Sequence, residues 1–493
     1  MTASLSVGII GTGFSGICAA IQVQKQLGIK ATVFEASDEV GGTWNHNTYP
    51  GCACDIPSHL YSLSFAPNPN WSRRFSPQSE IHQYLRNVAK KYNLYDQTLF
   101  NTEVVQANWL EELKKWELTV REKGSLENRV LLFDVVFAGL GPLRIPKYPK
   151  EFKPFEGTII HTAFWDDSVD LTGKKVAVVG SGASAVQLIP KLQPIVSHLT
   201  SYQRNPTWCI VRRQYKYSSF IQFLFKWVPF LMKLYRLYIY LGREIFYVNF
   251  RYFDSYVGKI ARKFSTKEME KRLISKGRPD LIKSLVPDYD FGCRRITPSE
   301  VYLESLTENN VSVERNAIKS VNGHTITTAD GNEFECDVLI LATGYDTTGF
   351  LGNLQVNGRN GQNLNQLWED NYTKTYKSVA IHGFPNFFML LGPASLLGHN
   401  SVVTMAEIQV DNAIQCIKQL RRGTKAIEPT KESQEEFVTK LKTDLGKTVW
   451  ATNCNSWYKD AQGEVFALWS STVTAFYWHL WSNNFKKDFI KYT

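Results

Sequence analysis

Two glycine-rich stretches, each lying between a short apolar run and a helical pattern, constrain the fold of this 493-residue chain more than any other feature. In the first, Gly11-Thr-Gly13-Phe-Ser-Gly16 follows the apolar run 6–10, and a helical pattern continues to about Leu27. A strand, a GxGxxG turn and a helix in this order form a unit that holds a dinucleotide at the helix N-terminus. Gly11 makes the tight turn, Gly13 lets the backbone approach a pyrophosphate, and Gly16 lets the helix pack on the strand.

An acidic residue completes this first unit. The β-branched run Ala31 to Phe34 ends at Glu35, whose carboxylate can accept a hydrogen bond from a ribose hydroxyl. A lone GxGxxG is weak as a signal, but it is strong when a strand precedes it and a helix, a strand and an acid follow it. Because such a unit at the start of a chain commonly binds FAD, the sequence predicts a flavin site here.

The second stretch repeats the first with one informative change. The strand signal 174–179 leads into Gly180-Ser-Gly182-Ala-Ser184-Ala, then a helix to about Leu192 and a strand that ends at Arg204. Arg204 stands at the same spacing as Glu35, and an arginine there suits a 2′-phosphate where an acid suits a free hydroxyl. The sequence therefore predicts that NADPH binds the second unit and passes a hydride to the flavin. Arg212 and Arg213 could add to the phosphate site, although a solvated basic face explains them better.

Composition excludes several other classes of protein. The hydrophobic fraction of 43% is typical of a globular chain with a sizeable core. The net charge of +10 suits anionic partners, but the sequence has no Lys/Arg tract and no nucleic-acid-binding module, so we predict no nucleic-acid partner. The eight cysteines are scattered without a C-x-x-C pair, which argues against a secreted disulfide scaffold and a disulfide reductase. The histidines lack ligand spacing, so we predict no metal site.

Residues 218–250 form an unusually apolar and aromatic segment. No stretch of 18 residues in it is free of charged side chains, so we do not predict a membrane-spanning helix. At helical spacing its basic residues fall on one stripe, and Pro229 bends the helix or divides it in two. These basic residues are Lys226, Lys233, Arg236 and Arg243. The favoured interpretation is a helical insertion packed on the NADPH unit near the substrate entrance. The alternative is a helix that lies on a membrane surface and draws in lipophilic substrates.

A long motif lies between the two glycine turns. It has the pattern FxGxxxHxxxWD and consists of Phe155, Gly157, His161, Trp165 and Asp166. This pattern resembles the fingerprint of the Baeyer–Villiger monooxygenases, a family of FAD- and NADPH-dependent enzymes. Flavin monooxygenases that oxygenate amine nitrogen or sulfur usually carry Tyr or Phe where Trp165 stands.

Two further motifs are similar to that family. Gly41-Gly42-Thr43-Trp44, Tyr49-Pro50-Gly51 and Asp55 match a second family motif at every defined position. Leu341-Ala-Thr343-Gly344-Tyr345 resembles the strand end that touches FAD again. The resemblance covers residues 5 to about 405, and the end of the chain, including 456–458, looks more like the hydroxyacetophenone-oxidising branch.

The resemblance also implies roles for individual residues. Arg295 matches the active-site arginine, Asp55 the aspartate that pairs with it, and Arg294 the cation that helps hold the NADPH 2′-phosphate. His161 and Trp165 match residues thought to couple domain movement to catalysis. In the implied cycle NADPH reduces FAD, O2 adds to give a C4a-peroxyflavin, and this attacks a ketone to give an ester or lactone. Such chemistry needs a permanent cation in a dry site, and a buried arginine needs a carboxylate partner.

The expected fold class is α/β, with two Rossmann-like dinucleotide-binding domains and a helical insertion in the NADPH domain. We expect an FAD domain in two parts, 1–145 and 331–493, with the strand at 337–341 returning to it. The NADPH domain covers 150–330, with its insert at about 215–290. His399-Asn-Ser401 lies near the flavin or caps the helix that follows it.

Alternatives remain open for the function and the setting. A flavin monooxygenase acting on nitrogen or sulfur and an uncoupled NADPH oxidase share the same two units. The aromatic insert indicates a bulky or lipophilic ketone. No basic segment precedes the first apolar stretch, so the sequence does not predict a signal peptide. We therefore expect a cytoplasmic, reducing setting, with the chain either free or peripheral to a membrane.

Overall fold

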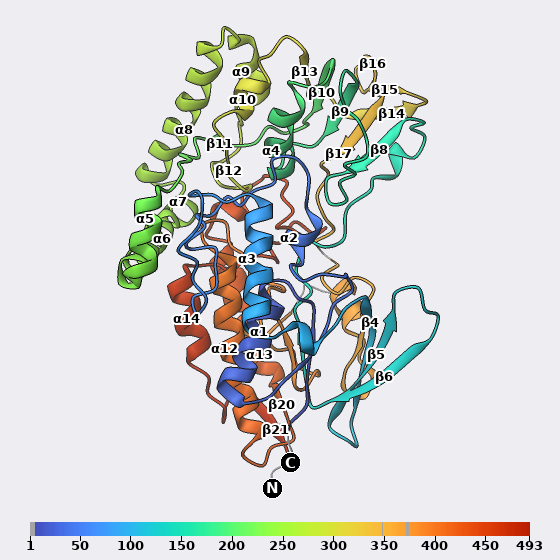
Figure 1. The fold of residues 1–493 in the computed structure, drawn as a ribbon, viewed down its shortest axis with the longest axis vertical. Coiled ribbons are helices and arrows are strands. Elements are labelled where there is room, and N and C mark those ends of the chain that lie inside the picture. The colour runs from blue at the N-terminus through green and yellow to red at the C-terminus, as the bar shows by residue number, and fades with distance from the viewer. Residues whose placement is uncertain (1–4, 348, 371–373) are drawn as a thin grey trace.

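Each glycine turn follows the central strand of a parallel sheet in the computed structural model, which describes residues 5–347, 349–370 and 374–493 (Figure 1). The first sheet has the order β19 (Phe387–Met389), β7 (Val135–Ala138), β1 (Val7–Ile10), β2 (Thr32–Phe34) and β3 (Thr98–Leu99). All of its strand pairs are parallel. Strands β1, β7 and β19 are short apolar runs that are buried on both faces, as expected for a parallel sheet, whereas β3 at the edge is only partly buried.

The second sheet has the same architecture. Its order is β13 (Val311–Glu314), β10 (His198–Tyr202), β9 (Lys175–Val179), β17 (Val338–Leu341) and β8 (Thr158–His161), again all parallel. The predicted α/β fold with two dinucleotide-type units is therefore confirmed. The placement of one strand was wrong: 337–341 does not return to the first sheet, because Val338–Leu341 pairs with β9 and β8 in the second.

The helices after the glycine turns match the sequence prediction closely. They are α1 (Phe14–Leu27) and α4 (Ala183–Leu192), and each begins directly after the second glycine of its motif. α1 ends at Gly28, where a φ of +67° suits glycine. Small residues on α1 let it pack against β1 on one side and against α12 (Val402–Leu420) on the other.

Smaller elements surround the two sheets. A mixed sheet next to the first unit contains β18 (Gln355–Asn357), β4 (Thr102–Leu110), β5 (Lys115–Glu122) and β6 (Asn128–Phe133), in which β18 pairs with β4 in parallel and the other two pairs are antiparallel. A separate antiparallel sheet contains β14 (Ile318–Asn322), β15 (Thr325–Thr328) and β16 (Glu333–Glu335). Two further strand pairs are β11 (Cys209–Ile210) with β12 (Thr297–Pro298), and β20 (Ala426–Pro429) with β21 (Phe489–Tyr492). The remaining helices outside the insert are α2 (Thr43–His46), α3 (Gln78–Lys91), α10 (Tyr302–Ser305), α11 (Leu364–Asp370), α13 (Lys431–Leu445) and α14 (Val473–Trp481).

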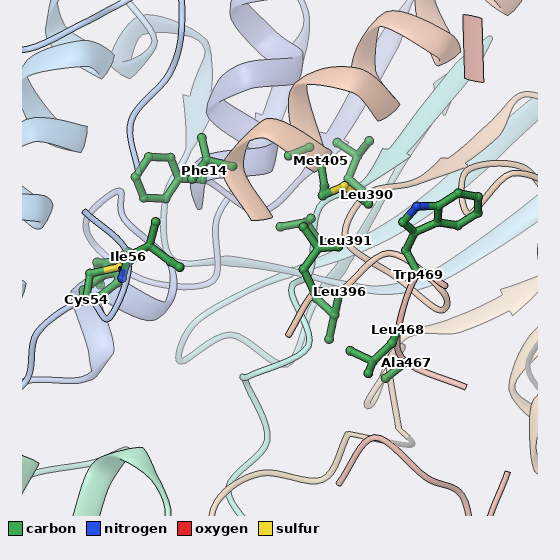
Figure 2. Packing of buried hydrophobic residues seen from close by; sticks show 14 of the residues in the cluster. Phe14, Cys54, Ile56, Leu390, Leu391, Leu396, Met405, Ala467, Leu468 and Trp469 are labelled. Atoms are coloured by element: carbon green, nitrogen blue, oxygen red, sulfur yellow. Dashed lines mark hydrogen bonds between the residues drawn. The ribbon is translucent and has the colours of Figure 1, made fainter. Parts of the chain in front are cut away.

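The core of the first unit joins distant parts of the chain. Figure 2 shows Phe14 of α1 and Ile56 of the following loop in one cluster with Leu390, Met405 and Trp469. Both ends of the described chain thus supply the apolar surface that holds the first sheet and its helix together.

The insert consists of α5 (Ser219–Trp227), α6 (Pro229–Phe246), α7 (Val248–Arg251), α8 (Tyr256–Ser275) and α9 (Ile282–Leu285). Pro229 is the first residue of α6 and divides it from α5, in agreement with the prediction. Over residues 5–347, 349–370 and 374–493, none of the helices combines the length and apolar content needed to cross a membrane.

The predicted basic stripe of the insert is only partly exposed, because Lys226 and Lys233 face solvent whereas its two arginines face the protein. Arg236 lies on the inner side of α6, where its Nη1 donates to the His59 carbonyl at 2.7 Å and to the Ser62 hydroxyl at 3.0 Å. Arg243 lies on the same inner side, near Asp55. The insert therefore packs on the first unit as well as on the NADPH unit, and many of its large apolar side chains lie on the outer face.

Candidate functional site

The first glycine turn brings strand and helix into close backbone contact. Gly11 has a φ of +94°, and a Cβ there would lie 2.7 Å from the Gly139 carbonyl oxygen. A Cβ on Gly16 would lie only 1.8 Å from the carbonyl oxygen of Gly11. Any side chain at either position would force the backbone apart, which agrees with the roles predicted for both glycines.

The second family motif joins the same turn. Gly13 is the N-cap of α1 and supplies no side-chain cap, so the first amides of the helix are open to an anion. Gly42 lies against it, and a Cβ on Gly42 would come within 2.9 Å of the Gly13 Cα. Thr43 and Trp44 follow on α2, where Trp44 Nε1 donates to the Tyr61 hydroxyl at 3.1 Å.

Glu35 is buried at the end of β2, as expected for a ribose-binding acid. Its Oε2 accepts from the Thr12 amide at 2.8 Å and the Thr12 hydroxyl at 2.5 Å, and its Oε1 accepts from the Ser37 amide at 2.9 Å. A carboxylate has about four lone-pair sites, so one acceptor site is left for a ribose hydroxyl. The open helix amides, the facing glycines and this carboxylate fit the two phosphates and ribose of FAD.

The second glycine turn has the same close packing. Gly180 has a φ of +126°, and a Cβ there would lie 2.3 Å from the Ala342 carbonyl oxygen. Gly182 is the N-cap of α4 and has no side-chain cap, and a Cβ there would meet open space. Ser184 lies in the first turn of α4. The start of this helix therefore offers open amides to a second pyrophosphate.

Two arginines lie close together beside this turn. Burial lowers the pKa of Arg294, and the nearby charge of Arg204 lowers it further. Arg294 stacks over Tyr289 with its guanidinium 5.3 Å from the ring centre, and its buried Nε has no hydrogen-bond partner within the described residues. Among the residues that the structure describes, neither Arg204 nor Arg294 forms an ion pair with a carboxylate. Two cations without an acid fit the 2′-phosphate of NADPH. Arg212, by contrast, pairs with Glu300 at 3.3 Å.

Arg295 and Asp55 form a two-point ion pair between the two units. Arg295 Nε donates to Asp55 Oδ2 at 2.8 Å, and its Nη2 donates to Oδ1 at 2.7 Å. Arg295 Nη1 donates to the Leu397 carbonyl at 3.0 Å, and both charged side chains are 23% exposed. Burial raises the pKa of Asp55, but Arg295 more than offsets this, so the pKa is lowered. Burial likewise lowers the pKa of Arg295, but Asp55 outweighs it and raises the pKa. Both side chains stay charged at neutral pH.

Two side chains beside this pair were missed in the sequence. Burial and the charge of Arg295 lower the pKa of Arg243, on α6, to about 10 despite the opposing charge of Asp55. Tyr458 is 1% exposed, and its hydroxyl has no hydrogen-bond partner among the described residues. Burial raises the pKa of Tyr458 to about 12, and the charges of Arg295 and Asp55 act on it. In the sequence, Arg243 stood out only as part of the basic stripe and Tyr458 only as part of the chain's end, because both reach the site through tertiary packing.

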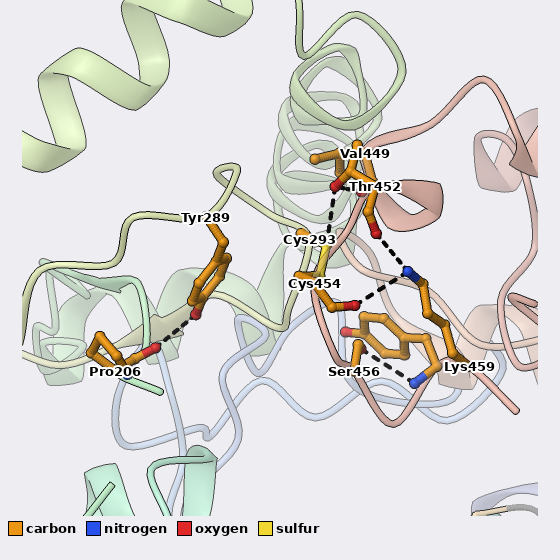
Figure 3. Close-up of a disulfide and its surroundings, with 9 residues drawn as sticks. Pro206, Tyr289, Cys293, Val449, Thr452, Cys454, Ser456 and Lys459 are labelled. Carbon is orange, nitrogen blue, oxygen red and sulfur yellow. Dashed lines mark hydrogen bonds between the residues drawn. A yellow bond between two sulfur atoms is a disulfide. The ribbon is translucent and has the colours of Figure 1, made fainter. Parts of the chain in front are cut away.

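A disulfide lies next to the arginines. Cys293, directly before Arg294, is bonded to Cys454 with a Cα–Cα distance of 6.3 Å (Figure 3). In the same view Lys459 Nζ donates to the carbonyls of Thr452 at 2.5 Å and Cys454 at 3.2 Å. The bond links the arginine segment to the loop that carries Tyr458. The scattered spacing of the cysteines gave no sign of it.

The interdomain fingerprint divides into two parts. Phe155 lies in a hydrophobic core beside β8, and a Cβ on the partly buried Gly157 would lie 2.5 Å from the Asp337 carbonyl oxygen. His161 ends β8, and its Nε2 lies 3.2 Å from the hydroxyl of Thr343, which donates to the Lys147 carbonyl at 2.6 Å. Burial lowers the pKa of His161 to about 4, so its ring is neutral at physiological pH.

The rest of the fingerprint and the third motif lie near His161. Trp165 is half-buried, whereas Asp166 is exposed and accepts from the Ser168 amide at 2.9 Å. Gly344 has a φ of +78°, and its carbonyl accepts from the Lys147 amide at 2.9 Å. The structure thus brings His161, Thr343 and Gly344 together, but it places Phe155 and Gly157 away from them.

The junction between the units is held by the Tyr-Pro-Gly part of the second motif. Tyr49 donates to Gln187 Oε1, on α4, at 2.8 Å. Gly51 has a φ of +86°, and a Cβ there would lie 2.4 Å from the Gln187 carbonyl oxygen. A small pocket opens beside this contact and is lined by Asp55, Gln187 and Thr297 among others. The motif therefore packs the flavin-side loop on the helix of the second unit.

Comparisons with known proteins agree with this arrangement. A family model described as "Flavin-binding monooxygenase-like" matches residues 4–234. A Baeyer–Villiger monooxygenase of Streptomyces coelicolor is 36% identical over 95% of this chain and 89% of its own length. One from Pseudomonas aeruginosa is also 36% identical, over 94% of this chain and 87% of its own.

Solved structures show the same fold over the whole chain. An oxidized steroid monooxygenase bound to NADP has a TM-score of 0.85 at 26% identity, covering 99% of this chain and 100% of its own. The protein OTEMO in complex with FAD and NADP has a TM-score of 0.86 at 25% identity, with full coverage of both chains.

Proposed function

Because this chain belongs to the Baeyer–Villiger monooxygenase family, we propose that it inserts one oxygen atom of O2 into a ketone, using FAD and NADPH. The product is an ester or a lactone. In the balanced reaction, ketone, O2, NADPH and one proton give ester, NADP⁺ and water. The observation that carries this proposal is the charged Arg295–Asp55 pair between two dinucleotide-binding turns.

The two glycine turns would hold the two cofactors. Gly11, Gly13, Gly16 and Glu35, with Gly42 to Trp44, would hold FAD, which when bound and reduced supplies activated oxygen to the substrate. Gly180, Gly182 and Ser184 would bind the NADPH pyrophosphate, and Arg204 with Arg294 its 2′-phosphate. Thr343 and Gly344 stay proposals as flavin contacts, because their observed contacts are with His161 and Lys147.

Arg295 would supply the permanent cation that the reaction needs. Its guanidinium cannot lose a proton under working conditions, and Asp55 both compensates its charge and fixes its orientation. A fixed cation in a partly closed site stabilises negative charge that develops on the reacting oxygens. Arg243 adds positive charge to the same place, which opposes protonation of any oxyanion there.

The division of the chain into domains is also part of the proposal. A first FAD part ends near 145, and the NADPH domain begins near 150. Since β17 belongs to the second sheet, we place the return to the FAD domain after Leu341 rather than at 331. Phe155, Gly157, His161, Trp165 and Asp166 would connect the two domains.

Product analysis tests the proposal. Purified protein, supplied with NADPH and O2, should convert a ketone to an ester with one NADPH consumed per product. A sulfide offered in parallel measures oxygenation of soft nucleophiles. Ester formation from the ketone supports the proposal, whereas sulfoxide or N-oxide as the only product would move the chain to the nitrogen- and sulfur-oxygenating class. Hydrogen peroxide equal to the NADPH consumed, with every substrate, would show an NADPH oxidase.

The free hydroxyl of Tyr458 gives a prediction of its own. Tyr458→Phe should leave the melting temperature unchanged or slightly raised, because it removes a buried group without a partner. It should lower kcat for ester formation by about fivefold if that hydroxyl donates to the substrate, since a neutral hydrogen bond contributes about 1 kcal/mol. Tyr202→Phe is the matched control, since its hydroxyl is also buried without a partner but lies under the β14–β16 sheet. Equal kcat in both variants would exclude a role for Tyr458 in the reaction.

Two finer expectations about partners also stand as proposals. The aromatic insert supports a bulky or lipophilic ketone, and residues 218–250 support peripheral contact with a membrane. The assignment to the hydroxyacetophenone-oxidising branch stays a prediction from the chain's end.

A further inference from the structure

One side of the molecule exposes many large apolar side chains, and we propose that this side docks on an anionic lipid bilayer. The side is formed by α5, α6, α8 and α14, which lie along the left edge in Figure 1. We call the apolar surface of α5, α6 and α14 the docking face. Its residues are Phe220, Ile221, Phe223, Trp227, Phe230, Leu231, Leu234, Leu237, Tyr238, Leu241, Ile245, Trp478 and Trp481, each between 38% and 72% exposed.

The docking face follows a regular helical stripe on α6. Its exposed apolar residues recur every three or four positions from Phe230 to Ile245, which gives a stripe about 120° wide at ~100° per residue. Met232 and Ile239 lie buried on the opposite side together with Arg236 and Arg243. The helix thus turns its apolar stripe to solvent and its arginines to the protein, which is the reverse of the usual surface helix.

α14 continues the docking face beyond the insert. Glu244 of α6 accepts hydrogen bonds from the Val473 amide at 3.1 Å and the Thr474 amide at 2.9 Å at the start of α14. The hydroxyls of Tyr240 and Thr474 lie 2.8 Å apart. These contacts fix the two helices together, so Trp478 and Trp481, 62% and 58% exposed, extend the same surface.

Single exposed apolar residues are normal, but a contiguous set of this size marks a site of association. The side chains are long aliphatic and aromatic groups, including three tryptophans, which suit the boundary between lipid headgroups and acyl chains. A helix that presents such a stripe lies in the plane of the interface and does not cross it.

The charge of the insert identifies the kind of surface. Between residues 218 and 283, Lys and Arg outnumber Asp and Glu by nine, close to the net charge of +10 of the whole chain. Several of these cations are exposed lysines: Lys226 and Lys233 lie on α5 and α6 within the docking face's own helices, and Lys259, Lys263, Lys267 and Lys271 lie on α8, on the same side of the molecule. A second copy of this chain would bring two such sets of cations together, and like charges would oppose the contact. Anionic lipid headgroups complement these cations, and salt weakens that attraction.

Docking does not depend on the proposed reaction, although it would supply the lipophilic ketone that the proposed function includes. α6 carries the docking face outward and Arg243 inward toward the Arg295–Asp55 pair. The same helix would therefore lie between the bilayer and the site.

Vesicle binding tests the proposal. Binding of the purified protein, with its flavin, is measured by co-sedimentation with phosphatidylcholine vesicles, with or without phosphatidylglycerol, at low and high salt. We expect binding to the anionic vesicles at least about tenfold stronger than to the neutral ones, weakened by salt. The test variant is Leu234→Gln with Leu237→Gln and Trp478→Gln, which should lower this binding at least about tenfold. Leu126→Gln is the matched control, because Leu126 is 98% exposed but follows β5, away from the docking face.

Flavin content and activity on a water-soluble ketone are measured for each variant, so that loss of folding or of catalysis is separated from loss of docking. Equal binding by the test variant and the wild type would overturn the proposal. A dimer in light scattering that the same substitutions disrupt, without vesicle binding, would overturn it in favour of a second copy. An inactive protein that still binds vesicles would contradict the proposed function and leave the docking face supported.

Discussion

Replacing Arg295 by alanine lowers the rate of ester formation by about 10²- to 10³-fold, while the variant keeps its flavin and still oxidises NADPH. The expected size is that for removing one fixed donor from developing negative charge, about 3–4 kcal/mol of transition-state stabilisation. The structure gives the reason, since Arg295 is held by two hydrogen bonds to Asp55 and one to Leu397. The measurement is product formation per NADPH consumed, with hydrogen peroxide assayed in the same sample.

Arg295→Lys and Asp55→Asn serve as controls for this prediction. Lysine keeps the charge but loses the two-point pairing, so we expect a partial loss of rate. Asp55→Asn keeps the arginine but removes its compensating charge and its alignment, and we expect a loss between those of the other two variants. If Arg295→Ala slows NADPH oxidation as much as ester formation, the arginine binds the coenzyme and does not act on oxygen transfer.

Removing both Arg204 and Arg294 reduces the preference for NADPH over NADH by about 10²-fold or more, through a higher KM for NADPH. A hydrogen bond to a charged group contributes about 1.5–3 kcal/mol, or roughly tenfold to a hundredfold for each arginine. NADH has no 2′-phosphate, so its KM should change little. The measurement is kcat/KM for both coenzymes in the single and double alanine variants.

Arg212→Ala is the matched control for the coenzyme prediction. Arg212 is a nearby arginine, but Glu300 already pairs with it, so its removal should leave the coenzyme ratio unchanged. An equal loss with NADPH and NADH in the double variant would show that Arg204 and Arg294 support the fold of the second unit and do not read the phosphate.

The sequence predicted the features that depend on local backbone geometry. Gly11, Gly16 and Gly180 could be identified because a turn that forbids a Cβ leaves a glycine at a fixed spacing. The Arg295–Asp55 pair was found only through the family resemblance, since 240 positions separate the two residues. Its geometry agrees with that expectation.

Features that depend on tertiary packing were not predictable in the same way. The apolar run 337–341 fits a central strand of either sheet, so its pattern could not say which one it joins. The periodicity of α6 shows which residues share a face but not which face is buried, so it could not show that Arg236 and Arg243 lie on the inner side. Arg243 and Tyr458 reach the site from the insert and from the chain's end, where no spacing rule relates them to Arg295.

The shared core of the first unit has a consequence for how the chain folds during synthesis. β1 and α1 are synthesised well before β19, which pairs with β7 at the edge of the same sheet, and before α12, which packs on α1. The first sheet therefore stays without an edge strand and a covering helix until most of the chain has been made. The second sheet, whose five strands lie between Thr158 and Leu341, can close earlier. We therefore expect the NADPH unit to complete its sheet before the flavin unit, although part of the flavin unit precedes it in sequence, which would differ from the usual N-to-C order.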